Sequence, residues 1–310
     1  MKPIVTLTVN PAIDYASEAE EVVPVRKIRT RGERFDPGGG GINVARVVRE
    51  LGGEAHAVYM AGGVSGPVFE GLLARTGVPG TGVPIAGDTR ISHLVREHAT
   101  GHEFRFTPAG PTVSAAEWEA CRAAVEVIEA DYLVLSGSLI PGLPSDAYRQ
   151  IVRDVKPRGT RVVVDTSGAA LHWALEEGVH LVTPNKRELE HLMGRRASDA
   201  REEEELAAEL VGSGRAEMVA LTLGPRGALL VTGDRRLRLP APEVATVSTV
   251  GAGDSFTAAM TLGLARGWPP ERAFAYGIAA GAATATTPGT ELCHRAEVER
   301  LFAEVCARLA

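Results

Sequence analysis

Short runs of apolar and β-branched residues alternate with longer stretches of helical periodicity, and this alternation constrains the fold more than any other feature of the chain. The strand-like runs are Ile4–Val9, Ala57–Met60, Tyr132–Leu135, Val162–Val164, Leu181–Val182 and Val219–Leu223. The helical stretches are Ile42–Leu51, Ala116–Ile128, Ala147–Val155, Glu203–Leu210 and Ser255–Ala265. Strands that alternate with helices usually form a parallel sheet, because each helix returns the chain to the same edge. The sequence therefore predicts an α/β fold with a mostly parallel sheet covered by helices.

Two early segments, Ile13–Arg34 and Thr89–Thr107, break this rhythm. Both mix polar and apolar residues without the spacing of an amphipathic helix. We interpret them as a small inserted sheet that rises beside the ligand crevice, where it could act as a lid and meet its copy in another subunit. A pair of long surface hairpins is the alternative.

Composition limits the classes of partner. The chain has 310 residues, 45% of them hydrophobic, and a formal net charge of −6, which argues against a general role at nucleic acids or membrane surfaces, since both attract basic proteins. Three cysteines, without a CxxC pair, give no zinc pattern and favour a reducing compartment. No leader pattern precedes the first strand-like run and no apolar run reaches bilayer length, so we expect a cytoplasmic protein. The acidic run Glu202–Glu205 reads as a solvated helix face.

Asp254 follows a glycine-rich stretch, Gly251-Ala252-Gly253, and begins a helix of small residues. Glycines before a helix let backbone N–H groups converge on an anion, and the helix dipole also favours negative charge there. A carboxylate at this point could accept the proton of an attacking hydroxyl while the amides stabilise a transferring phosphoryl group. Asp254 could instead only cap the helix.

A second glycine cluster, Gly38 to Gly41, also precedes a helix and is followed by Asn43. Four consecutive glycines permit close approach of a sugar to the backbone, and an asparagine side chain both donates to and accepts from hydroxyls. This pattern favours substrate recognition, with a flexible turn and a helix cap as the alternative.

Other phosphate, cofactor and catalytic patterns are missing from the sequence. It contains no Gly-Lys dipeptide and therefore no Walker loop, and neither glycine cluster fits the GxGxxG fingerprint of NAD-dependent dehydrogenases. No HExxH metal pattern occurs, and SGSLIPG lacks the GxSxG order of a hydrolase nucleophile. A phosphate cradle of another kind is required.

The two clusters, GGGGINVAR and STVGAGDS, together with TLTVNPAID near the N-terminus, resemble the ribokinase-like (B-type phosphofructokinase) sugar kinases, and most of all the bacterial minor-type 6-phosphofructokinases. The resemblance runs through nearly the whole chain, with DTR at 88–90, SGSLIPG at 136–142, TPNKREL at 183–189, LTLGPRGAL at 221–229 and GTELC at 289–293. It implies a three-layer α/β/α core formed by 1–12, 35–87 and 108–310, and a β-sheet lid formed by 13–34 and 88–107. It also implies a homodimer built through the lids.

The resemblance assigns roles residue by residue. Asp254 would be the catalytic base, with the amides of Gly251, Ala252 and Gly253 as the anion hole. The sugar phosphate would be bound by Asp14, Lys27, Gly39, Asn43, Arg90, Arg105 and Ser138. Arginine suits the phosphate through its planar fork of donors, although each of these cations could be a solvated surface charge.

For the nucleotide, the resemblance implies ATP and Mg²⁺ near Asn185, Glu188, Thr222, Gly224 and Gly227. Glu188 could also be an ordinary first-turn carboxylate, and Gly224 an ordinary turn residue. A potassium site is implied around Ser248, Val250, Thr284, Thr287 and Gly289. Glu291 stands where the family members that it resembles most carry a basic residue, so this site or its regulation could differ.

The expected reaction is ATP-dependent phosphorylation of the C1 hydroxyl of fructose 6-phosphate. Tagatose 6-phosphate and fructose 1-phosphate are alternative substrates, and the four-glycine run favours fructose 6-phosphate because the other two groups usually carry lysine at the position of Gly40. A sugar-phosphate-binding regulator without catalysis is the alternative from another class, although it should have lost the base or the anion hole.

Overall fold

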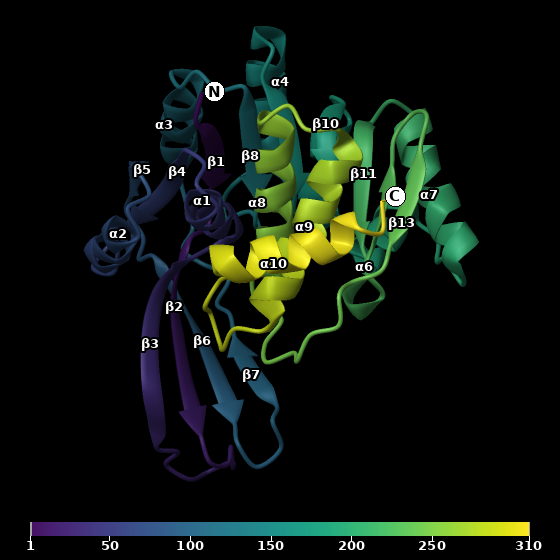
Figure 1. Ribbon diagram of the computed structural model, residues 1–310. Helices are drawn as coiled ribbons and strands as arrows, with labels where there is room; N and C mark the ends of the chain where they lie inside the picture. Colours follow the sequence, from purple (N-terminus) through teal and green to yellow (C-terminus); the bar gives the residue numbers. More distant parts are fainter. Residues whose placement is uncertain (1, 310) are drawn as a thin grey trace.

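The computed structural model describes residues 2–309, and within them a nine-stranded sheet forms the centre of the molecule (Figure 1). Its strand order is β13-β12-β11-β10-β9-β8-β1-β4-β5. All neighbours pair in parallel except β11 with β12 and β12 with β13. The strands are β1 Ile4–Thr8, β4 Ala55–Gly62, β5 Gly80–Ile85, β8 Tyr132–Ser136, β9 Arg161–Asp165, β10 Val179–Val182, β11 Ala216–Thr222, β12 Ala228–Val231 and β13 Arg236–Leu239.

Helices cover both faces of this sheet, as the alternation predicts. One face carries α1 Gly40–Glu50, α2 Gly66–Arg75, α8 Ala252–Ala265, α9 Pro270–Ala285 and α10 Arg295–Cys306. The other face carries α3 Ala115–Glu126, α4 Ala147–Val155, α5 Gly168–Leu175, α6 Lys186–Met193 and α7 Ala200–Gly212. Side chains of each strand alternate between the two faces, so Ile4 joins one hydrophobic core and Val5 the other. The core also contains two short 3₁₀ turns, η1 Lys156–Arg158 and η2 Gly224–Arg226.

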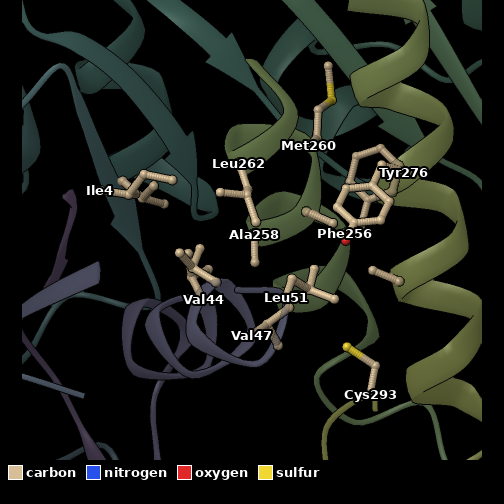
Figure 2. Packing of buried hydrophobic residues seen from close by; sticks show 14 of the residues in the cluster. Ile4, Val44, Val47, Leu51, Phe256, Ala258, Met260, Leu262, Tyr276 and Cys293 are labelled. Carbon is tan, nitrogen blue, oxygen red and sulfur yellow. The ribbon is translucent and has the colours of Figure 1, made fainter. Parts of the chain in front are cut away.

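Helix α1 packs against helix α8. This packing sets the relative position of Asn43 on α1 and Asp254 on α8, two candidate residues of the sequence analysis. In Figure 2, Val44 and Val47 of α1 lie near Ala258 and Leu262 of α8, inside one buried cluster. The next helix approaches α8 closely as well, since a Cβ added at Gly277 of α9 would lie 3.0 Å from the Phe256 carbonyl oxygen. The small-residue segment Gly277–Ala283 therefore packs tightly.

The two early segments do form a separate sheet, of order β3-β2-β6-β7, which extends away from the core in Figure 1. Its strands are β2 Ala12–Ala19, β3 Thr30–Gly38, β6 Arg90–Glu97 and β7 Glu103–Phe106. The central pair, β2 with β6, is parallel and the outer pairs are antiparallel. We call it the lid sheet. Strand β3 continues to Gly38, beyond the predicted boundary of the segment at Arg34.

One expectation about the surface is wrong. Within the acidic run of α7, Glu203 is not solvated: only 1% of it is exposed, and Lys186, Arg226 and Arg238 bind its carboxylate. Glu203 shares the buried face of the helix with Leu206, Ala207 and Leu210, at helical spacing.

No helix between residues 2 and 309 combines the length and the apolar character needed to cross a membrane.

Candidate active site

A cavity of about 310 Å³ lies where the lid sheet meets the core. Ser136 at the carboxyl end of β8 and Asp165 at that of β9 form its floor, together with the first turns of α1 and α8. Ligands of open α/β sheets bind in the crevice outside the carboxyl ends of the strands, so this location agrees with the general rule for the fold. The lid sheet adds Asp14, Arg90 and Arg105 to the lining.

Asp254 faces this cavity from the first turn of α8. The helix N-cap is Gly251, with a φ of 74°, and no side-chain cap hydrogen bond is formed. The Asp254 carboxylate instead accepts a hydrogen bond of 2.9 Å from Asn43 Nδ2. Capping therefore does not account for this aspartate.

The amides that precede Asp254 belong to the first turn of the helix, whose N–H groups have no acceptor one turn back. Gly251 lines the cavity, and Ala252 N–H donates to the Thr249 carbonyl oxygen at 3.3 Å. A Cβ added at Gly253 would meet nothing within 4 Å, so the backbone is open on that side. This geometry suits an anion at the helix start.

Asp14 lies on β2 and lines the same cavity. Its carboxylate packs against the backbone of Gly38, where an added Cβ would lie 2.0 Å from Oδ2, so a side chain here would push the Asp14 carboxylate out of its place. Burial raises the pKa of Asp14 to about 6, although Arg46, Arg105 and Arg90 each lower it.

The two arginines from the lid sheet differ in their bonding. Arg90 donates to the backbone carbonyl oxygens of Asn10 at 2.9 Å and Pro108 at 3.0 Å, which fixes its guanidinium at the base of the lid. Its Nε is buried and has no protein acceptor in the described part of the chain. Arg105 lines the cavity from β7, and no protein side chain within residues 2–309 forms a salt bridge with it. Of the two lid-sheet arginines, Arg105 therefore has more N–H donors free for a bound anion.

The glycine run Gly38 to Gly41 forms part of the cavity wall. Gly39 and Gly40 line the cavity. A Cβ added at Gly40 would lie 2.2 Å from Ser136 Oγ and 3.2 Å from Asp254 Oδ1, so a side chain here would displace groups of the site. Ser138 also lines the cavity, and its hydroxyl accepts a hydrogen bond of 3.4 Å from Asn10 Nδ2.

Asp165 belongs to the cavity although the sequence analysis did not select it. Its carboxylate accepts hydrogen bonds from Ser136 Oγ at 3.4 Å and Thr257 Oγ1 at 3.3 Å. Burial raises the pKa of Asp165, and the nearby charges of Asp254 and Glu188 raise it further. The signal available in the sequence was its position, directly after the apolar run Val162–Val164 at the carboxyl end of a predicted strand.

Arg46 was missed as well. Its Nη1 donates to Asn43 Oδ1 at 3.3 Å and to the Pro37 carbonyl oxygen at 3.0 Å, and its Nη2 contacts Asp36 Oδ1 at 3.2 Å. The Arg46 guanidinium thus contacts the Asn43 side chain, which in turn donates a hydrogen bond to Asp254. Nothing in the sequence distinguishes Arg46 from the other basic residues of the helix.

The residues expected at the nucleotide lie beside the cavity. Glu188 lines it, and Glu188 and Asn185 form a capping box at the start of α6, with hydrogen bonds of 2.8 and 3.0 Å. Asn185 also lines an adjoining open cleft of about 660 Å³ and pairs with Thr222 in an isolated β-bridge. Gly224 and Gly227 bound the η2 turn that follows Thr222, both with positive φ.

The segments expected around potassium are adjacent in the structure. Val247 N–H donates to the Ala285 carbonyl oxygen at 2.8 Å, which joins the stretch containing Ser248 and Val250 to the end of α9. Thr287 Oγ1 lies within hydrogen-bond distance of the carbonyl oxygens of Thr284, at 2.8 Å, and Glu291, at 2.6 Å, and Gly289 has a φ of 59°. The Glu291 carboxylate contacts Arg34 Nη1 of the lid sheet at 2.6 Å.

Lys27 does not join the site of its own chain. It is exposed in the loop between β2 and β3 and is not part of the cavity lining.

Comparison with known proteins gives a consistent result. The family model described as "pfkB family carbohydrate kinase" matches residues 4–297. The chain is 42% identical to ATP-dependent 6-phosphofructokinase isozyme 2 of Mycobacterium tuberculosis, over 96% of this chain and 88% of the relative. It is 39% identical to the protein of the same name from Escherichia coli, over 98% and 99%.

The fold agrees with solved structures of phosphofructokinase-2 from E. coli. The complex of that protein with potassium has a TM-score of 0.95 and 38% identity, and covers 99% of this chain and 100% of its own. Its complex with fructose-6-phosphate has a TM-score of 0.93 and 37% identity, with the same coverage. A tetrameric inhibited form of the E. coli protein matches with a TM-score of 0.94.

Proposed function

Because this chain belongs to the pfkB family of carbohydrate kinases, we propose that it transfers the γ-phosphoryl group of ATP to the C1 hydroxyl of fructose 6-phosphate. The products are ADP and fructose 1,6-bisphosphate. The observation that carries the proposal is one cavity that holds a carboxylate at a helix start, Asp254, opposite a carboxylate and two arginines from the lid sheet.

Asp254 acts as the base. It accepts the proton of the C1 hydroxyl as the oxygen attacks the γ-phosphorus, and the bond from that phosphorus to the leaving oxygen of ADP breaks. Burial raises the pKa of Asp254 toward the range in which a general base is efficient near neutral pH. The amides of Gly251, Ala252 and Gly253 stabilise the negative charge of the phosphoryl group in transit.

Different residues bind the hydroxyls and the phosphate of the sugar. The Asp14 carboxylate and the Asn43 side chain bind the sugar hydroxyls, while Gly39 lets the sugar lie close to the backbone. Arg105 binds the 6-phosphate, and Arg90, with two N–H groups already bound to carbonyl oxygens, holds the lid-sheet wall of the phosphate site. Ser138 completes the polar lining.

ATP occupies the side of the cavity formed by α6, η2 and the start of α8, with Asn185, Glu188, Thr222, Gly224 and Gly227 around it. Asp165, Glu188 and Asp254 lie close together, and the charges of Asp254 and Glu188 add to the effect of burial in raising the pKa of Asp165. Within residues 2–309, no cluster of three or more such side chains is arranged to hold a metal ion directly. Asp165 and Glu188 would thus hold Mg²⁺ with water and ATP phosphates as further ligands, and the ion would neutralise charge on the phosphates.

Potassium would be held by carbonyl oxygens of the two joined segments that contain Ser248, Val250, Thr284, Thr287 and Gly289. The stretch that contains Ser248 and Val250 leads directly into α8, so a cation there would add positive charge beside the anion hole. The Glu291 side chain is engaged by Arg34 and His294, each at 2.6 Å, in place of the basic side chain expected at this position.

A homodimer through the lid sheets is supported by an exposed aromatic row across the strands. Phe35, Tyr15, His93 and Phe106 are cross-strand neighbours, with ring centroids 4.7, 4.6 and 6.2 Å apart. Phe35 and Phe106 are 52% and 57% exposed, and alternation along the strands puts them on the face opposite to Asp14. Such a surface favours a protein partner.

A second subunit also gives Lys27 a role. Lys27 lies outside the cavity of its own chain, so it would reach a sugar phosphate only in the site of a partner. We further propose that residues 13–34 and 88–107 close over the substrate as a lid, with 1–12, 35–87 and 108–310 as the core, and that the enzyme works in the cytoplasm on soluble sugar phosphates.

The test is ADP release with ATP, Mg²⁺ and K⁺, comparing fructose 6-phosphate, tagatose 6-phosphate, fructose 1-phosphate and free fructose. We expect the highest kcat/KM for fructose 6-phosphate, because this chain has Gly40 at the position where kinases of the other two sugar phosphates usually carry lysine. Preference for tagatose 6-phosphate or fructose 1-phosphate would keep the mechanism and change the substrate. Binding of a sugar phosphate without ADP release would instead support the non-catalytic regulator.

A further inference from the structure

Glu203 is a buried carboxylate with an unusual set of partners. It lies on α7, outside the cavity, and among the described residues it is bound by cations from α6, η2 and β13. Arg226 Nη2 contacts Oε1 at 2.7 Å, Lys186 Nζ contacts the same oxygen at 3.3 Å, and Arg238 Nη1 contacts Oε2 at 3.0 Å. A buried carboxylate costs stability unless it is paired in this way.

The partners of Glu203 belong to the segments assigned above to ATP. Lys186 is the first residue of α6 and follows Asn185 directly. Arg226 lies inside the η2 turn, between Gly224 and Gly227. The same turn rests on the end of β13, since a Cβ added at Gly227 would lie 2.0 Å from the Leu239 carbonyl oxygen.

Two of the three cations that bind Glu203 have a second acidic neighbour. Lys186 also approaches Glu190 at 3.8 Å, and Arg238 approaches Glu204 at 3.7 Å. Arg226 has no other acidic partner within residues 2–309. Loss of the Glu203 charge would therefore release the η2 turn most of all.

We infer that Glu203 is a positioning residue for nucleotide binding: through Arg226 and Lys186 it holds the η2 turn and the start of α6 in the arrangement that receives ATP. The inference rests on the proposed nucleotide site. Glu203 itself touches no substrate, so its loss acts on ATP and leaves the sugar-phosphate half of the cavity unaffected. The strength of the contacts agrees with a lowered pKa of Glu203, which hydrogen bonds from Arg226, Arg238 and Lys186 produce in spite of burial.

The test uses Glu203→Gln in the full-length protein. Glutamine has the same shape, but its amide nitrogen would point N–H donors at a guanidinium that has only donors. We expect the KM for ATP to rise about tenfold, while the KM for fructose 6-phosphate changes less than about twofold. Arg226→Gln, which leaves Glu203 paired with Lys186 and Arg238, should have the same selective effect, and the double variant should be no worse than the worse single variant.

Glu205→Gln is the matched control, because Glu205 is on the same helix and, among residues 2–309, forms a salt bridge only with exposed Arg201, at 2.8 Å. This variant should keep both KM values. If Glu203→Gln folds and its KM for ATP is unchanged, or if both KM values rise together, Glu203 has no positioning role. If Glu203→Gln does not fold, an unchanged KM for ATP in Arg226→Gln overturns the inference. Absence of ADP release by the wild type, in contrast, would reject the proposed function itself.

Discussion

The amide of Asn43 donates a hydrogen bond of 2.9 Å to the carboxylate of Asp254, and this bond joins the two glycine-rich motifs of the chain. Asn43 is in the first turn of α1, Asp254 in the first turn of α8, and the two helices pack against one buried cluster. The orientation of the proposed base is thus fixed by the packing of two helices.

Asp254→Asn should lower kcat about 10³-fold, because an amide cannot accept the hydroxyl proton. The KM for fructose 6-phosphate should stay within about threefold, since Asp14, Asn43 and Arg105 remain. Steady-state kinetics with both substrates measures this. A raised KM with normal turnover at saturation would mean that Asp254 binds the sugar and is not the base.

Arg105→Gln should raise the KM for fructose 6-phosphate about tenfold or more, which corresponds to ~1.4 kcal/mol of binding free energy. The KM for ATP should not change. Arg75→Gln is the control, since Arg75 is an exposed residue at the end of α2, outside the cavity. An unchanged KM for the sugar phosphate would remove Arg105 from the phosphate site.

Asp14→Asn should weaken sugar binding and yet stabilise the protein at pH 7.5. Burial raises the folded-state pKa of Asp14 from 3.8 to about 6, so the folded state binds this proton more tightly than the unfolded state does. Stability conferred by the protonated group is therefore present below pH 3.8 and is lost as the pH rises through 6. We expect the variant to melt about 2–4 °C higher at pH 7.5 and with almost no difference near pH 4. Equal melting temperatures at pH 7.5 would contradict this.

Arg46→Gln should move the acid limb of the pH profile of kcat/KM upward by about 0.5–1 unit. Arg46 lowers the pKa of both Asp14 and Asp254 and contacts Asn43, while Arg105 acts in the same direction. Arg49→Gln is the control, because Arg49 is exposed in the last turn of the same helix. A fall in activity without any movement of the profile would indicate that Arg46 only supports the fold.

Phe106→Ser should convert a dimer to monomers, because Phe106 ends the exposed aromatic row of the lid sheet. Light scattering would then give half the wild-type mass. Val127→Ser removes an even more exposed apolar side chain, 80% accessible, at the end of α3 and should leave the mass unchanged. A wild-type protein that is already monomeric would refute the lid interface.

The sequence predicted the sheet and the position of Asp254 because both depend on local patterns, namely apolar runs and glycines before a helix. It did not predict β12 and β13, whose short antiparallel pairing depends on partners rather than on their own residues. Nor did it reveal Arg46 or Asp165, which matter through contacts made across the fold.

Glu203 also shows what a local sequence pattern can and cannot predict. Four consecutive glutamates look solvated, but Glu203 stands at the helical spacing of the buried Leu206, Ala207 and Leu210. The apolar pattern of the helix could have identified which glutamate turns inward. The cations that neutralise it come from distant segments and could not have been identified from spacing.

The bond between Asn43 and Asp254 joins residues 211 positions apart. A chain that emerges from the ribosome from its N-terminus therefore carries its sugar-binding residues long before it has a base. Nascent or prematurely terminated chains that end before α8 would be unable to consume ATP, and activity would begin only once nearly the whole protein has been synthesised.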